Sequence, residues 1–315
     1  MKYILSSLLV LCFFLNATAE SKKKPIAKNK VRTEKKTTSE KPKLVKKPKN
    51  DLTRAKLKGN IKSVTEIKYK VSGTDSAYKY NIVSKNVHNY NESGNETEIM
   101  NYDENNKLRG KATLKYNKDG KIAEHYTTSD EGTIYKNETY SYDSKGNKTE
   151  MDYFNTAGAT AGKALFKYDD NGNMIEVTEY EIDSTIKLKH TNKYDKNGNK
   201  IEEKFFKPNA KAKKGNTVLF QRVTYKYDNA GNRVEENVYS GNNILESKVT
   251  SLYNENNEKI SEKEDLKTQK LQINYSWKYE QKDENGNWLQ KTLFENNKST
   301  EMLQRKIKYA KDAVE

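Results

Sequence analysis

The stretch Lys167-Tyr168-Asp169-Asp170-Asn171-Gly172-Asn173-Met174-Ile175-Glu176 decides the fold, because close copies of it recur along the chain. Full copies begin at Tyr142, Tyr168, Tyr194 and Tyr227. Weaker copies begin at Tyr90, Tyr116, Tyr253 and Tyr279. The spacing is 26 residues, apart from one step of 33 residues between Tyr194 and Tyr227. A fixed spacing of this length is the mark of a repeat protein, in which each unit packs against its neighbours.

The composition of each copy predicts two antiparallel strands joined by tight turns. Asp169–Gly172 has the residues of a type I turn that ends with a glycine at positive φ. A second turn is expected about halfway through each unit, near residues 155–158 and 240–243. The predicted fold is all-β: an antiparallel meander of 26-residue units over residues 56–310. Roughly 18 to 20 strands would form one long curled or wrapped sheet, since open sheets rarely exceed ~10 strands.

The alternation of side chains predicts which residues share a face. If Asp169–Gly172 is the loop, the facing pairs are Tyr168 with Asn173, Phe166 with Ile175, and Ala164 with Val177. This register makes one face apolar and places Lys167 and Glu176 on the opposite, wet face.

The beginning of the chain has the pattern of an export signal. Lys2 precedes an apolar run from Ile4 to Leu15, and Ala17-Thr18-Ala19 supplies the small residues that signal peptidase requires. Residues 1–19 are therefore predicted to be a cleaved signal peptide, with the mature protein in the periplasm, at the cell surface or outside the cell. The apolar run is shorter than the ~20 residues of a spanning helix, so no transmembrane segment is expected after cleavage. Lipidation of Cys12, the only cysteine, is the alternative.

Residues 20–55 are predicted to be a disordered Lys/Pro-rich linker. From Glu20 to Asn50, thirteen lysines and arginines stand against three glutamates, which gives a net charge of +10 out of +15 for the whole chain. Such a segment buries too little apolar surface to fold. It is either a solvated spacer or a contact for an anionic surface. Nucleic acid is not expected as a partner, because the folded part has no basic stripe.

The Tyr-Asp-x-x-Gly-Asn core at Tyr142, Tyr168, Tyr194 and Tyr227 resembles the YD repeat of rearrangement-hot-spot-like proteins. These are large bacterial surface proteins whose repeats form a wrapping β-sheet, and the resemblance covers roughly residues 90–294. The chain is most similar to the short exported YD-repeat proteins. That resemblance implies a bacterial envelope or extracellular protein, with sugar binding as one role.

Catalytic and metal-binding patterns are not found in the sequence. His88, His125 and His190 have no spacing typical of a metal or catalytic set. The acidic turns match neither an EF-hand nor a nonapeptide calcium repeat. We therefore expect no enzyme activity, no metal and no cofactor.

Tyrosine is abundant, at 22 of 315 residues. The repeat positions fall on equivalent strands, so their rings either cover the sheet or form an aromatic ladder for a ligand. The candidate binding residues are Tyr142, Tyr168, Tyr194, Tyr227, Tyr253 and Tyr279. The predicted function is a non-enzymatic exported scaffold for a protein partner or a glycan. The alternatives are a structural envelope component and a secreted hydrolase.

Overall fold

The computed structural model describes residues 50–73, 77–209 and 215–310, and in these ranges one short helix is followed by eighteen strands. Each strand is antiparallel to its neighbours. The all-β meander predicted from the sequence is therefore confirmed. The elements are α1 (Asp51–Arg54), β1 (Ile61–Ser72), β2 (Lys79–Tyr90), β3 (Glu96–Asp103), β4 (Leu108–Tyr116), β5 (Ile122–Ser129), β6 (Ile134–Tyr142), β7 (Lys148–Phe154), β8 (Thr160–Tyr168), β9 (Met174–Glu181), β10 (Ile186–Tyr194), β11 (Lys200–Pro208), β12 (Thr217–Tyr227), β13 (Arg233–Ser240), β14 (Leu245–Tyr253), β15 (Lys259–Leu266), β16 (Leu271–Lys282), β17 (Trp288–Glu295) and β18 (Lys298–Tyr309).

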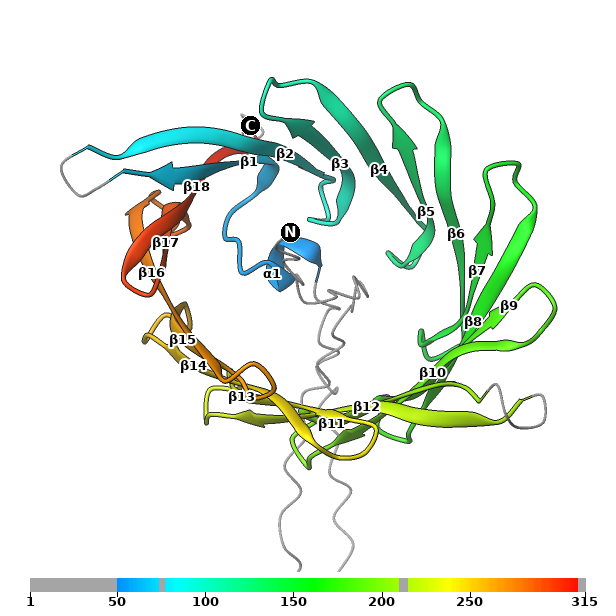
Figure 1. Ribbon diagram of the computed structural model, residues 1–315. Helices are drawn as coiled ribbons and strands as arrows, with labels where there is room; N and C mark the ends of the chain where they lie inside the picture. The colour runs from blue at the N-terminus through cyan, green and yellow to red at the C-terminus, as the bar shows by residue number, and fades with distance from the viewer. Residues whose placement is uncertain (1–49, 74–76, 210–214, 311–315) are drawn as a thin grey trace, which may run out of the picture.

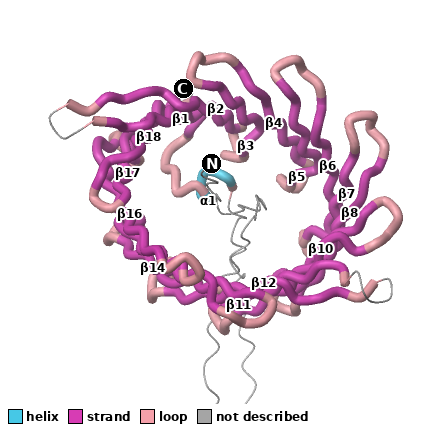
Figure 2. Tube along the Cα trace, viewed as in Figure 1, coloured by secondary structure: helices cyan, strands magenta, loops and turns pink. Residues whose placement is uncertain are grey.

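The sheet closes on itself, which corrects the expected long curled or wrapped sheet. β1 pairs with β2 on one side and with β18 on the other, so the first and last strands meet. Figures 1 and 2 show the resulting complete ring of strands. The seam runs from the pair Ile61 and Tyr309 to the pair Lys70 and Glu301. Closure removes both free edges, whose unpaired backbone groups would otherwise be exposed.

The helix α1 identifies the inner face of the sheet, because it lies inside the ring (Figure 1). Tyr90 packs against the buried cluster that contains Leu52 of α1. The Tyr116 hydroxyl oxygen lies 2.9 Å from Asp51 Oδ2. The repeat tyrosines therefore point inward, and cross-strand neighbours on the same face follow them around the ring.

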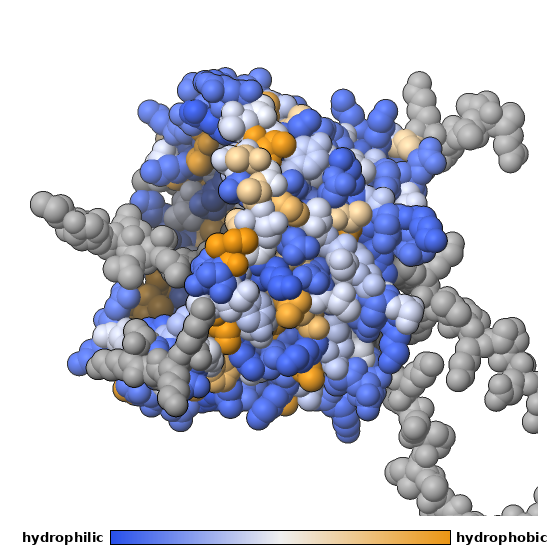
Figure 3. Space-filling view, turned by 90° about the vertical axis from the view of Figure 1, so that its right-hand side faces the viewer, coloured by the Kyte–Doolittle hydropathy of each residue, from blue (hydrophilic) through white to orange (hydrophobic). Residues whose placement is uncertain are grey.

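The outer face carries cross-strand ion pairs, as the sequence predicted for the wet face. Lys167 pairs with Glu176 at 2.8 Å, and the same arrangement recurs two strands later in Lys193 with Glu202 at 3.2 Å. The side view in Figure 3 is mostly hydrophilic, with small separate apolar spots. These exposed pairs contribute little individually to stability, but they keep this face of the sheet wet.

The predicted register beside the turn was wrong, by one residue at Tyr168 and by two residues beyond the bulge. Lys167 faces Glu176 and Tyr168 faces Met174, so Ile175 is an extra residue in a β-bulge. Phe166 consequently faces Val177 instead of Ile175. A bulge adds one residue to one strand and increases the local twist. The same shift recurs at most of the tyrosine-associated turns.

The turn at Asp169–Gly172 has the predicted geometry. Gly172 N–H donates to the Asp169 carbonyl at 3.0 Å, and Gly172 has a φ of +80°. At the corresponding position of a weaker copy, Asn257 has a φ of +58°. The turns predicted halfway through the units are also present at residues 155–158 and 240–243.

Replacing Gly172 with Val is expected to destabilise the protein by more than ~1 kcal/mol, because a β-branched residue is strained at positive φ. Denaturant unfolding measures the effect. Gly172→Asn serves as the control and should cost less, since asparagine tolerates this conformation. Coincident unfolding midpoints for Gly172→Val and the native chain would contradict the turn geometry.

The predicted linker ends earlier than expected, because residues 50–55 belong to the packed structure. The Asn50 side chain caps α1 by accepting from Thr53 N–H at 2.9 Å. Leu52 and Leu57 are buried with Ile61 and Val64 of β1. The remaining linker residues and the predicted signal peptide lie outside the described residues.

Candidate binding site at the turn rim

All the turns that follow a repeat tyrosine lie at one end of the cylinder, because they join an even-numbered strand to the next odd-numbered strand of a meander. We call this end the turn rim. Its turns are residues 91–95, 117–121, 143–147, 169–173, 195–199, 228–232, 254–258 and 283–287.

The Asp-x-x-Gly-Asn residues hold the turns of the rim together. Asp169 Oδ1 accepts the backbone N–H groups of Asn171 at 3.0 Å and Asn173 at 2.8 Å. Asp169 Oδ2 accepts from Asn173 Nδ2 at 2.9 Å. Burial raises the pKa of Asp169, but these hydrogen bonds outweigh it and leave the pKa below its usual value. The carboxylate of the turn thus binds the backbone of its own turn. In the described ranges, no group of three or more His, Cys, Asp or Glu side chains is arranged to hold a metal ion.

Five of the repeat tyrosines connect a hairpin to the one before it. The hydroxyl at the end of an even-numbered strand donates to the carbonyl of the first residue of the preceding odd-numbered strand. These bonds join Tyr116 to Glu96 (2.6 Å), Tyr142 to Ile122 (2.8 Å), Tyr194 to Met174 (2.8 Å), Tyr227 to Lys200 (2.8 Å) and Tyr253 to Arg233 (3.1 Å). For Tyr142 the bond lies beyond the last backbone pair of β5 and β6, so the side chain extends the pairing toward the rim.

Five of the six predicted ligand-binding tyrosines are brought to equivalent positions along the rim. Tyr142, Tyr168, Tyr194, Tyr227 and Tyr253 end β6, β8, β10, β12 and β14. Tyr279 lies inside β16 and packs against Trp288, with 6.1 Å between ring centroids. Burial raises the pKa of Tyr142, Tyr168 and Tyr194 to about 12, so their hydroxyls remain donors. The role of these rings as a ligand platform stays a prediction.

Replacing Tyr142 with Phe removes one hydroxyl bond and leaves the ring in place. We expect a loss of about 1 kcal/mol in the free energy of unfolding, because the Ile122 carbonyl loses its donor. The exposed Tyr135 provides the matched control, since Tyr135→Phe should leave the unfolding midpoint unchanged. Equal midpoints for both variants would show that the hydroxyl does not connect the hairpins.

A segment of the chain itself is bound at the turn rim. We call residues 50–60, which precede β1, the strap. At one end, Asn50 Nδ2 donates to the Ser93 carbonyl at 2.7 Å and Leu52 N–H donates to the Gly94 carbonyl at 3.1 Å. In the middle of the strap, Lys56 Nζ donates to the Asn257 carbonyl at 3.0 Å. The rim therefore holds a peptide segment through groups of well-separated turns.

The other end of the strap is held by a single amide side chain. Lys58 N–H donates to Asn287 Oδ1 at 2.8 Å, and Asn287 Nδ2 donates to the Lys58 carbonyl at 2.9 Å. An amide side chain has one donor side and one acceptor side, and here it matches both groups of one peptide residue. Asn287 is the last residue of its Asp-x-x-Gly-Asn turn and is 4% exposed.

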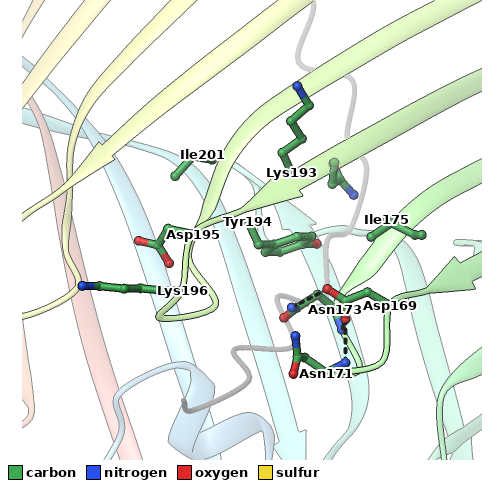
Figure 4. Close-up of a pocket in the computed structure, with 10 residues that line it drawn as sticks. Asp169, Asn171, Asn173, Ile175, Lys193, Tyr194, Asp195, Lys196 and Ile201 are labelled. Carbon is green, nitrogen blue, oxygen red and sulfur yellow. Dashed lines mark hydrogen bonds between the residues drawn. The ribbon is translucent and has the colours of Figure 1, made fainter. Parts of the chain in front are cut away.

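Grooves open between neighbouring turns of the rim. One groove of about 480 Å³ lies between the turns 169–173 and 195–199, with Asn173, Ile175, Tyr194 and Ile201 among its lining residues. Figure 4 shows Tyr194 between Asp195 of one turn and Asn173 of the other. A second groove of about 700 Å³ lies between the turns 195–199 and 228–232. Both are shallow and open to solvent.

The inner wall below the rim carries buried charges, which corrects the expectation of an apolar face. Glu138 is 6% exposed in its side chain and interacts with His125 Nδ1 at 3.0 Å, the Tyr140 hydroxyl at 2.7 Å and Lys136 Nζ at 3.0 Å. Strand pairing also brings His88 Nδ1 to 2.5 Å from a Glu96 oxygen. The sequence analysis missed both contacts between histidine and acid, because the partners come from different strands.

A regular signal for these inner charges is present in the sequence. Three pairs recur with the basic residue six positions and the acidic residue nine positions after a repeat tyrosine. They are Lys200 with Glu203 at 3.0 Å, Arg233 with Glu236 at 3.0 Å and Lys259 with Glu262 at 2.5 Å. The bulge turns the basic position inward, to the face on which the predicted register already placed the acidic position. The pairs could therefore be recognised only after the register was known.

Comparison with known protein families finds no match to the chain, and comparison with characterised proteins finds no relative. Several solved structures have a similar chain path. A porin-like protein from Bacteroides uniformis is 13% identical with a TM-score of 0.40, over 79% of this chain and 96% of that chain. A porin-like protein from Bacteroides vulgatus is 12% identical with a TM-score of 0.39, over 81% and 100% of the two chains.

The Photorhabdus luminescens Tc holotoxin pore is also similar, at 11% identity and a TM-score of 0.36. The match covers 70% of this chain but spans only 13% of the toxin chain. Within the described ranges, no helix has the length and hydrophobicity needed to cross a membrane.

Proposed function

We propose that this chain is an exported, non-enzymatic scaffold that holds a protein partner at the turn rim, at the bacterial envelope or outside the cell. We also propose that it belongs with the YD-repeat proteins. In the four full copies, the repeat tyrosine ends the strand that leads into the Asp-x-x-Gly-Asn turn, which supports this grouping. The basic segment before the strap gives the scaffold a means of contact with an anionic surface.

The observation that carries the proposal is the capture of the strap by the rim. Asn287 binds both backbone groups of Lys58, and Gly94 and Asn257 accept from two further strap residues. Side chains of the strap are held as well: Lys56 Nζ makes the contact with Asn257, Asp51 Oδ2 accepts from Glu96 N–H at 2.9 Å, and Leu52 and Leu57 are buried. Recognition of backbone groups suits a scaffold for polypeptide segments, because every peptide offers the same donors and acceptors.

The chemistry of the rim favours binding over catalysis. The turn carboxylates, such as Asp169, accept hydrogen bonds from their own turns. On the inner wall, Glu138 and Glu203 are each in contact with a cation and a tyrosine hydroxyl. Acids held in this way are poor candidates for a general acid or base, which requires a shifted pKa near the working pH.

A parallel screen of peptides and glycans tests the proposed function. The full chain is incubated with an array of short synthetic peptides and with a glycan array, and hydrolysis products are measured in both. We expect a subset of peptides to bind with micromolar affinity and no product to form. A response on the glycan array without any peptide binding, or release of a product from either array, would overturn the proposal.

A further inference from the structure

We propose that the groove between the turns 169–173 and 195–199 is a second peptide-binding site, which takes an extended segment with a free backbone N–H and an aliphatic side chain. This inference rests on the proposed function and deepens it, because it assigns a particular groove of the rim. The groove lies on a different part of the ring from the strap, whose contacts are with the turns 91–95, 254–258 and 283–287.

Two acceptors in the groove are buried and have no hydrogen-bond partner in the described part of the chain. They are Asn173 Oδ1 and Asn192 Oδ1, and both residues are 5% exposed. Their amide nitrogens are engaged, since Asn173 Nδ2 donates to Asp169 Oδ2 and Asn192 Nδ2 donates to the Met174 carbonyl, each at 2.9 Å. These bonds fix which end of each amide is the oxygen. A buried acceptor without a donor costs free energy that a ligand N–H can recover.

The chain itself shows what an asparagine at this turn position can bind. Asn173 and Asn287 both end an Asp-x-x-Gly-Asn turn, and both donate from Nδ2 to Oδ2 of the aspartate that opens it. In Asn287 the remaining oxygen accepts Lys58 N–H at 2.8 Å. The equivalent oxygen of Asn173 lies beside a groove and lacks such a donor. The same local geometry therefore fits the same ligand group, a peptide N–H.

The walls of the groove favour a peptide over a sugar. Ile175 and Ile201 line it and are 37% and 38% exposed, so they present aliphatic surface to an apolar side chain. The hydroxyl of Tyr194 already donates to the Met174 carbonyl. Sugar rings are usually bound against open aromatic faces, whereas an aliphatic wall beside amide acceptors suits a peptide backbone and its side chain.

The charged residues that line the groove indicate which charge the ligand carries. Asp169 and Asp195 oxygens are hydrogen-bonded within their own turns, and Lys193 is paired with Glu202 on the outer face. The groove therefore offers no cluster of one sign. We infer that a neutral or weakly basic segment binds better than a phosphorylated or strongly acidic one.

The test uses a labelled synthetic peptide with the sequence of residues 50–60, because this segment is bound by a turn asparagine in the chain. Binding to the full-length protein is measured by fluorescence anisotropy for the native chain, Asn173→Leu and Asn147→Leu. Asn147 is the matched control, since its Nδ2 makes the same turn bond to Asp143 Oδ2 at 3.0 Å but the residue does not line this groove. A second peptide carries an N-methyl group at the position of Lys58.

We expect Asn173→Leu and the N-methyl peptide each to weaken binding about tenfold, and Asn147→Leu to leave it unchanged. Thermal unfolding of the variants shows whether each one is folded. If the native chain and a folded Asn173→Leu variant bind the peptide equally, the assignment of this groove as a peptide site is wrong, while the proposed function stands. If no peptide in the wider array binds the native chain, both proposals fail. A response to glycans alone would also overturn both.

Discussion

Ile61→Asp is expected to destabilise the protein by more than about 4 kcal/mol, because it places a charge without a partner in the best-packed part of the structure. Ile61 is 1% exposed and packs with Leu52, Leu57 and Val64. It also pairs with Tyr309 at the seam. The substitution therefore weakens the strap and the closing strand pair together, and urea unfolding measures the loss.

The control for this variant is Ile182→Asp, in a turn where the isoleucine is 65% exposed. It should change the free energy of unfolding by less than about 0.5 kcal/mol, as surface substitutions generally do. If Ile61→Asp were as stable as Ile182→Asp, the seam and the strap would not be the packed core that the structure shows.

The second large effect is expected at Glu138 and depends on pH. Burial raises the pKa of this carboxyl, but hydrogen bonds from His125, Tyr140 and Lys136 outweigh it and lower the pKa from 4.5 to about 2. A depressed pKa stabilises the folded state above the unfolded pKa of 4.5, and this stabilisation is lost as the pH falls through about 2. The difference corresponds to about 3 kcal/mol at neutral pH.

Glu138→Gln should therefore lose about 3 kcal/mol at pH 7 and show a smaller fall in stability between pH 4.5 and pH 2 than the native chain. Chemical unfolding at a series of pH values measures both. Glu150→Gln is the control, because Glu150 lies on the outer face with 33% of its side chain exposed, and it should cost on the order of 0.5 kcal/mol. Parallel pH profiles for Glu138→Gln and the native chain would contradict this assignment.

The turns and strands were predictable because their determinants are local. The turn requires positive φ at the position of Gly172, and glycine adopts it without strain. Asp169 at the start of the same turn accepts hydrogen bonds from the backbone N–H groups of Asn171 and Asn173. The repetition of this motif at a fixed spacing then implies a meander of paired strands. In a weaker copy, Asn257 occupies the glycine position and also has a positive φ.

The register and the closure were not predictable from the same residues. A single inserted residue, such as Ile175, displaces the partners of the positions that follow it by two residues from the predicted pairs, and nothing in the motif distinguishes a bulged turn from a regular one. Closure depends on twist and curvature summed over the whole sheet. It depends on the pairing of Ile61 with Tyr309, which lie at opposite ends of the folded sequence.

Of the candidate site, only the placement of the repeat tyrosines was predictable. They end equivalent strands, as their spacing predicted, except for Tyr279, whose copy is displaced because its turn begins at Asp283, four residues later. The strap was missed because Leu52 and Leu57 are two apolar residues in a polar segment, and their burial depends on turns distant in sequence. Asn173 could not be separated from Asn147 or Asn199 by sequence, since the three occupy the same motif position.

The closed ring is tested most directly by a disulfide across the seam. Thr65 of β1 and Lys306 of β18 are paired residues, and paired Cα atoms at about 5 Å suit a disulfide. Cys12, the only native cysteine, is replaced by Ser, and Thr65→Cys/Lys306→Cys is compared with Thr65→Cys/Lys226→Cys, whose second position is on β12. Mild oxidation should cross-link the first pair within one molecule and leave the second pair reduced. Cross-links only between molecules, or equal cross-linking of both pairs, would contradict the closed sheet.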